Sequence, residues 1–145
     1  VAAHGDAGAL ADLARLEWAR LGVFDAPDPT PLGLEALAAV APEDWPALRF
    51  EPIAALEVLA SDWPVHRLWE HPDVPVGPPA PTVLRVWRQG FAVYHAPMEP
   101  AEACALARLR AGEPFGAICE GFDDAETAAA LLLRWIEDGL VAGLR

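Results

Sequence analysis

The sequence predicts an α+β fold in which an N-terminal segment of helices and extended chain packs on a winged-helix-like domain. Three features predict this class: a helix-periodic stretch near the N-terminus, two β-forming runs around Gln89-Gly90, and three capped helical segments after them. With 145 residues and a hydrophobic content of 54%, the chain is able to bury a core. A proline-rich connector, residues 71–81, separates region 1–70, which is helical and extended, from region 82–145, the winged-helix-like domain.

The first region opens with a predicted helix, Ala7–Leu21, which Asp6 can cap and Gly22 can end. Its apolar residues recur at intervals of three and four, which indicates one buried face: Leu10, Leu13, Ala14, Trp18 and Leu21. The start at Val1, without an initiator methionine, suggests that the chain is a fragment of a longer protein.

Three further elements are expected before the connector. Pro31–Val40 and Val65–Glu70 are predicted short helices, the former because proline suits a first helical position. Leu48–Ala60 is expected to be extended and bent at Pro52, and its candidate inward residues are Phe50, Ile53 and Val58.

The second region predicts a β-hairpin and three helices. The strands are Thr82–Arg88 and Phe91–Ala96, which a tight turn at Gln89-Gly90 joins. Glycines end the helices, and the first two begin at prolines: Pro100 to Ala111, a second from Pro114, and a third that Asp123 caps with Glu126 as its capping-box partner. The residues expected to be buried together are Leu106, Phe115, Ile118, Leu132, Trp135 and Ile136.

Composition and motifs argue against catalysis. The sequence contains no Gly-rich phosphate loop, nucleophile elbow or paired CxxC, so we expect no enzyme and no cofactor. His66, His71 and Asp73 are close in sequence but do not share a helical face, so solvated loop residues are expected there rather than a metal site. Cys104 and Cys119 are interpreted as buried packing residues in a reducing compartment, which predicts a cytoplasmic protein.

Net charge limits the partners that the chain can bind. The formal charge is −12, and all ten basic residues are arginine. The helices between Pro114 and Ile136 could form a helix-turn-helix, but the second of them would present Asp123, Asp124 and Glu126 to the phosphates. We therefore expect no nucleic-acid binding, although a DNA-binding or transcription-related domain is the alternative function. No apolar run reaches the length of a membrane span, so no membrane partner is expected.

Three segments carry a family resemblance: ADLARLEWAR (Ala11–Arg20), LRFEPIAALEVLASDWPVHRLW (Leu48–Trp69) and VLRVWRQGFAVYHAPMEPAEACALARLRAGEPFGAICEGF (Val83–Phe122). They resemble the C-terminal region of a bacterial family labelled as DNA-binding, which includes the bufferin and methanobactin accessory proteins HvfC, BufC and MbnC. The second half also resembles the PqqD-type domains that bind precursor peptides. The resemblance implies a non-catalytic accessory subunit, whose partners are an iron-dependent TIM-barrel enzyme and a cysteine-bearing, ribosomally made precursor peptide.

A peptide site is expected on the hairpin, because an exposed strand edge can accept an added strand. The candidate peptide-binding residues are Val83, Arg85, Trp87, Arg88, Phe91, Val93 and Tyr94. In this interpretation Arg85 and Arg88 attract acidic residues of a leader peptide. The alternative is that Leu48–Ala60, or a further N-terminal domain, covers that edge.

Overall fold

The computed structural model describes residues 2–145, and side chains from Ala7 onward. The chain forms two compact units, each made of two separate stretches. Unit 1 contains everything up to Ala26 together with Ala55–Met98, and unit 2 contains Pro27–Ala54 and Glu99–Arg145. Helices and antiparallel sheets occur together, so the predicted α+β class is confirmed.

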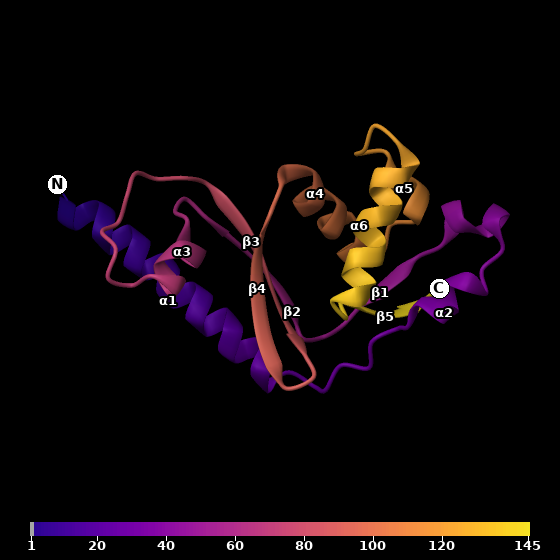
Figure 1. The fold of residues 1–145 in the computed structure, drawn as a ribbon, viewed down its shortest axis with the longest axis horizontal. Coiled ribbons are helices and arrows are strands. Elements are labelled where there is room, and N and C mark those ends of the chain that lie inside the picture. Colours follow the sequence, from indigo (N-terminus) through magenta and orange to yellow (C-terminus); the bar gives the residue numbers. More distant parts are fainter. Residues whose placement is uncertain (1) are drawn as a thin grey trace. The chain divides into compact units, whose positions relative to one another are not determined.

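Unit 1 is a three-stranded antiparallel sheet with helix α1 on one of its faces (Figure 1). The strand order is β2-β3-β4, and the strands are Leu56–Ser61, Thr82–Gln89 and Ala92–Met98. The hairpin between β3 and β4 is therefore confirmed, with Gly90 in the turn at φ 62°, a conformation that suits glycine. The short helix α3 has the predicted bounds, Val65–Glu70.

Helix α1 differs from the sequence prediction in length and in the face it buries. It runs from Ala2 to Asp25, so Gly22 lies inside it, and the side chain of the proposed cap Asp6 is outside the described part. The buried residues are Ala9, Leu16, Ala19 and Val23. The predicted face was wrong: Leu10 and Leu21 are exposed, and Trp18, expected in the core, is 76% exposed. The helix is apolar on several sides, and small alanines allow the closest approach to the sheet.

Unit 2 combines helices α4 (Pro100–Arg110), α5 (Phe115–Cys119) and α6 (Ala125–Glu137) with a two-stranded sheet. That sheet pairs β1 (Phe50–Pro52) with β5 (Val141–Leu144) in antiparallel order. The short helices α2 (Leu34–Ala38) and η1 (Pro42–Ala47) complete the unit. The six residues expected in a common core are all buried: Leu106, Phe115, Ile118, Leu132, Trp135 and Ile136.

Smaller predictions in unit 2 need correction. The cap of α6 is Asp124, whose carboxylate accepts a 2.7 Å hydrogen bond from the amide of Thr127, and not Asp123. Both cysteines were expected to be buried, and this prediction was wrong: Cys104 is exposed and Cys119 is half-buried. Helix α2 is shorter than the predicted Pro31–Val40, because the chain turns into the helix only at Gly33.

The division of the chain also differs from the expected one. The proline-rich residues 71–81 form a loop inside unit 1 rather than a connector between domains. The hairpin belongs to unit 1 with α1 and β2, whereas the three following helices belong to unit 2. The cause is strand pairing between distant segments, since β2 pairs with β3 across the loop and β1 pairs with β5.

Candidate functional site

The central strand β3 contains four of the predicted peptide-binding residues, Val83, Arg85, Trp87 and Arg88. It pairs with β2 on one side and with β4 on the other, so it has no edge for a peptide. Arg85 is 3% exposed, and its guanidinium lies 4.1 Å from the centre of the Trp87 ring. The expectation that Arg85 attracts a leader peptide from the surface is therefore wrong.

Arg88 has a structural role at the end of helix α1. Its Nε donates to the carbonyl of Val23 at 3.0 Å, and its Nη2 donates to the carbonyl of Ala26 at 2.6 Å. These carbonyls lie in and just beyond the last turn of α1, where backbone oxygens lack helical partners and where a cation is favourable. Arg88 is 4% exposed and thus holds the helix to the sheet rather than contacting a ligand.

The remaining predicted residues lie on the turn and on β4. Phe91 is 92% exposed beside Gly90, and Val93 is half-buried. Tyr94 is 45% exposed and stacks on Trp87, with ring centroids 5.6 Å apart.

The two outer strands, β2 and β4, carry the edges of the sheet. In an antiparallel ladder, alternate residues turn their N–H and C=O groups toward a given neighbour. The amide of Arg88 donates to the carbonyl of Ala55, so the even-numbered residues of β3 bond toward β2. It follows that the backbone groups of Leu56, Val58 and Ala60 face outward, as the bond from Arg15 Nη1 to the carbonyl of Ala60 confirms.

The edge of β4 is occupied in part. The same alternation turns Val93, His95 and Pro97 outward. Arg20 Nη2 donates to the carbonyl of Val93 at 3.2 Å, and Pro97 has no N–H to offer. One outward carbonyl is therefore taken and one outward amide is missing along this edge, so it offers a further strand fewer groups than a complete edge would.

Above that edge, Arg20 belongs to a packed aromatic cluster. Its Nη1 lies 2.7 Å from His95 Nδ1, and its guanidinium lies 4.3 Å from the centre of the Trp69 ring, which meets the His95 ring edge to face. Burial, together with the nearby Arg20 cation, lowers the pKa of His95. A neutral imidazole is also what the contact needs, because a guanidinium can only donate.

The edge of β2 is open and borders a groove. The groove has a volume of about 510 Å³ and lies between β2 and the flank of α1. Its lining is mainly apolar: Ala11, Ala14, Arg15, Trp18, Ala19, Glu57, Val58 and Leu59. Trp18, which the sequence placed in the core, thus stands beside an unpaired strand edge.

Polar contacts close one end of this groove. Arg15 bridges the Ala60 carbonyl and the Asp12 carboxylate, at 3.2 and 3.1 Å, and Ser61 Oγ donates to Asp12 at 2.6 Å. The hydrogen bond from Ser61 and the Arg15 cation hold the pKa of Asp12 below its usual value. At the other end, the Glu57 carboxylate leans over the backbone of α1, since a Cβ at Gly22 would lie 3.2 Å from Glu57 Oε1.

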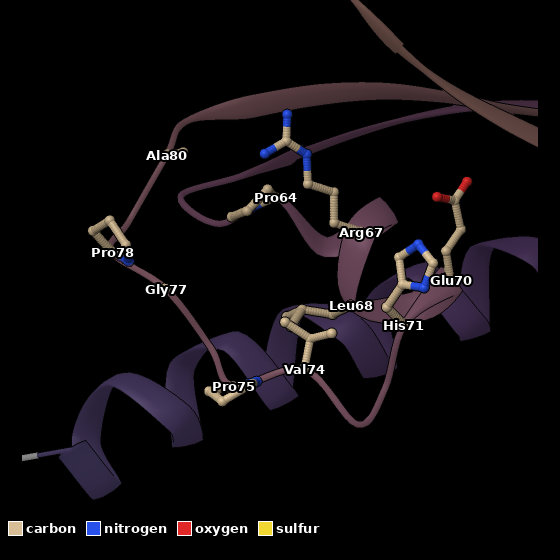
Figure 2. A pocket seen from close by; sticks show the side chains of 10 residues that line it. All are labelled: Pro64, Arg67, Leu68, Glu70, His71, Val74, Pro75, Gly77, Pro78 and Ala80. Atoms are coloured by element: carbon tan, nitrogen blue, oxygen red, sulfur yellow. The ribbon is translucent and has the colours of Figure 1, made fainter.

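A second hollow of about 520 Å³ lies between α3 and the proline-rich loop (Figure 2). Figure 2 shows Leu68 and Val74 side by side at its base, while the loop from Pro75 to Ala80 bows away from the helix. Its few polar side chains, Arg67, Glu70 and His71, do not form a set of ligands. Among the residues that the structure describes, no group of three or more His, Cys, Asp or Glu side chains is placed to hold a metal ion.

Sequence reasoning placed the peptide site on the hairpin and gave as its alternative that Leu48–Ala60 covers the hairpin edge. The structure has this alternative pairing on one side of the hairpin, because β2 within that segment pairs with β3. No helix among residues 2–145 is long and apolar enough to cross a membrane. Comparison of the chain with protein-family models, curated proteins and solved structures finds no match.

Proposed function

We propose that this chain is a non-catalytic recognition subunit that binds an extended peptide along strand β2, in the groove beside helix α1. The observation that carries the proposal is the open edge of β2, whose outward N–H and C=O groups lie beside an apolar groove. A peptide strand can satisfy such groups, and each backbone hydrogen bond is worth about 0.5–1.5 kcal/mol net. Helix α1 would cover alternate side chains of the bound strand.

The resemblance described above supplies the biological setting of the proposal. In that setting the peptide is a ribosomally made precursor, and the partner is an iron-dependent TIM-barrel enzyme in the cytoplasm. The chain order of a hairpin followed by three helices is the order found in PqqD-type winged-helix domains, although here the hairpin belongs to unit 1 and the helices to unit 2.

The outer face of α1 is a candidate contact for the partner protein. Trp18, Leu21 and Phe24 are all at least half exposed there, and Leu10 extends the same stripe. Exposed aromatic and aliphatic side chains that adjoin one another are typical of protein-binding surfaces. The groove and this stripe share Trp18, so one helix would serve both partners.

The edge can be tested by a substitution that removes only an outward amide. Val58→Pro deletes an N–H that faces away from β3 and thus leaves the ladder between β2 and β3 intact. Val93→Pro is the matched control on the opposite edge, because the Val93 amide also faces outward. Random nine-residue peptides would be selected on the wild-type chain, and their affinities for both variants measured by fluorescence anisotropy.

We expect Val58→Pro to weaken the selected peptides about tenfold or more and Val93→Pro to leave them nearly unchanged. N-methylation along a selected peptide should weaken binding at every second residue, because only alternate amides face β2. Equal affinity of all peptides for the wild type and Val58→Pro would reject the site.

A further inference from the structure

We infer that the groove selects a basic peptide segment, with Lys or Arg opposite Glu57 and a large apolar residue opposite Leu59. This inference rests on the proposed function and specifies the chemistry of its ligand. It reverses the preference for acidic peptides that the sequence suggested, because Arg85 and Arg88 are buried in the fold.

The length of the bound segment follows from the backbone groups that β2 leaves available. Leu56 and Val58 each turn an N–H and a C=O outward. At Ala60, Arg15 already donates to the carbonyl, so the N–H is the group left to donate to a new partner. A peptide strand therefore pairs with residues 56–60, and Arg15 marks the end of the pairing.

Side-chain alternation determines which peptide residues enter the groove. Glu57 and Leu59 lie on the face of the sheet that α1 covers, as the closeness of the Glu57 carboxylate to Gly22 shows. Residues directly opposite each other on neighbouring strands project to the same face. Thus two side chains of the peptide, those opposite Glu57 and Leu59, point toward α1 in either strand direction.

The position opposite Glu57 favours a cation. The exposed Glu57 carboxylate and the exposed Trp18 ring both line the groove. A carboxylate and an indole together recognise an ammonium or guanidinium group by charge pairing and cation–π attraction. The groove's one cation, Arg15, already pairs with Asp12, and the chain's net charge of −12 further disfavours an acidic peptide.

The position opposite Leu59 favours an apolar side chain. Leu59 lines the groove together with Ala11 and Ala14, whose short side chains leave space on the flank of α1. A branched or aromatic residue would fill this space and cover Leu59. The selected segment should therefore read as a basic residue and a large apolar residue separated by one position.

The peptide selection described above also tests this inference when it is repeated with charge variants. Peptides selected on the wild type should share Lys or Arg two positions from a large apolar residue. Glu57→Gln should weaken them about threefold and Glu57→Lys about tenfold, the range expected for losing and then reversing one exposed charge pair. Replacing the basic residue of the peptide with Glu should restore affinity for Glu57→Lys.

Glu43→Lys is the matched control, since it makes the same charge change at an exposed residue of η1 in unit 2. It should alter affinity less than twofold, because Glu43 does not line the groove and its replacement changes the net charge as much as Glu57→Lys does. Selected peptides that are sensitive to Val58→Pro but lack a basic residue, or that bind Glu57→Lys as well as wild type, would overturn this inference and leave the proposed function standing. A selection without peptides sensitive to Val58→Pro would overturn both.

Discussion

Arg88→Met would test whether this arginine belongs to the fold or to a ligand site. The change keeps an unbranched apolar stem but removes the guanidinium that bonds to the carbonyls of Val23 and Ala26. Hydrogen bonds that involve a charged group contribute about 1.5–3 kcal/mol each. Both hydrogen bonds are made by the same side chain, and water can reach the end of α1. The contributions of the two bonds to stability therefore do not add fully. We expect a loss of about 3 kcal/mol in the free energy of unfolding.

Urea denaturation followed by tryptophan fluorescence measures this loss, because the midpoint shifts while the slope of the transition stays constant. Arg110→Met is the control, since Arg110 is exposed on α4 and such a substitution changes stability by less than about 0.5 kcal/mol. Peptides selected on the wild type should bind the folded variant with unchanged affinity. A loss of stability no larger than that of the control, combined with weaker peptide binding, would refute the structural role of Arg88.

Three further predictions concern other parts of the molecule. Trp135→Ala should cost about 3–5 kcal/mol of stability, since Trp135 is 1% exposed and its indole N–H donates to Glu102 at 2.9 Å. Trp135→Phe should cost less, and chemical denaturation of the two variants would measure the difference. The lowered pKa of His95 means that the folded state favours the neutral ring. The contribution of the neutral ring to stability should be complete above the unfolded pKa of about 6.5 and lost as pH falls through the lower folded pKa. His95→Asn should therefore flatten the dependence of the melting temperature on pH between 5 and 7. Duplex DNA at micromolar concentration should show no salt-dependent anisotropy change with this acidic chain.

Local signals in the sequence predicted most secondary structure. Gln89-Gly90 between β-forming runs was sufficient for the hairpin, and glycines at positive φ end α4 and α6 where Gly112 and Gly139 were expected to end them. Such features depend on a few neighbouring residues. Non-local pairing was predicted less well. Coverage of the hairpin by Leu48–Ala60 was only the alternative expectation, and nothing within Val141–Leu144 indicates that it pairs with Phe50–Pro52.

The candidate site failed in prediction for a related reason. Arg85 and Arg88 appear in a strand of alternating character, and in an edge strand at least one of them would be exposed. Both arginines are buried instead: Arg88 bonds to carbonyls at the end of α1, which is distant in the sequence, and Arg85 lies over the ring of Trp87. Conversely, Trp18 was assigned to the core from helical spacing, although α1 carries apolar residues on more than one side. Periodicity alone does not identify which of several apolar faces meets the sheet.

The pairing of β1 with β5 has a consequence for the order in which a ribosome delivers the two units. Unit 1 has all its strands once Met98 has been made, whereas β1, which ends at Pro52, waits for β5, which begins at Val141. At about 5–20 residues per second, that wait lasts roughly 4–18 seconds. During it, the apolar side chains of Phe50 and Ile53 lack the C-terminal strand beside them. Nascent chains stalled before Val141 should therefore carry a protease-resistant unit 1 and a unit 2 that is still open to cleavage.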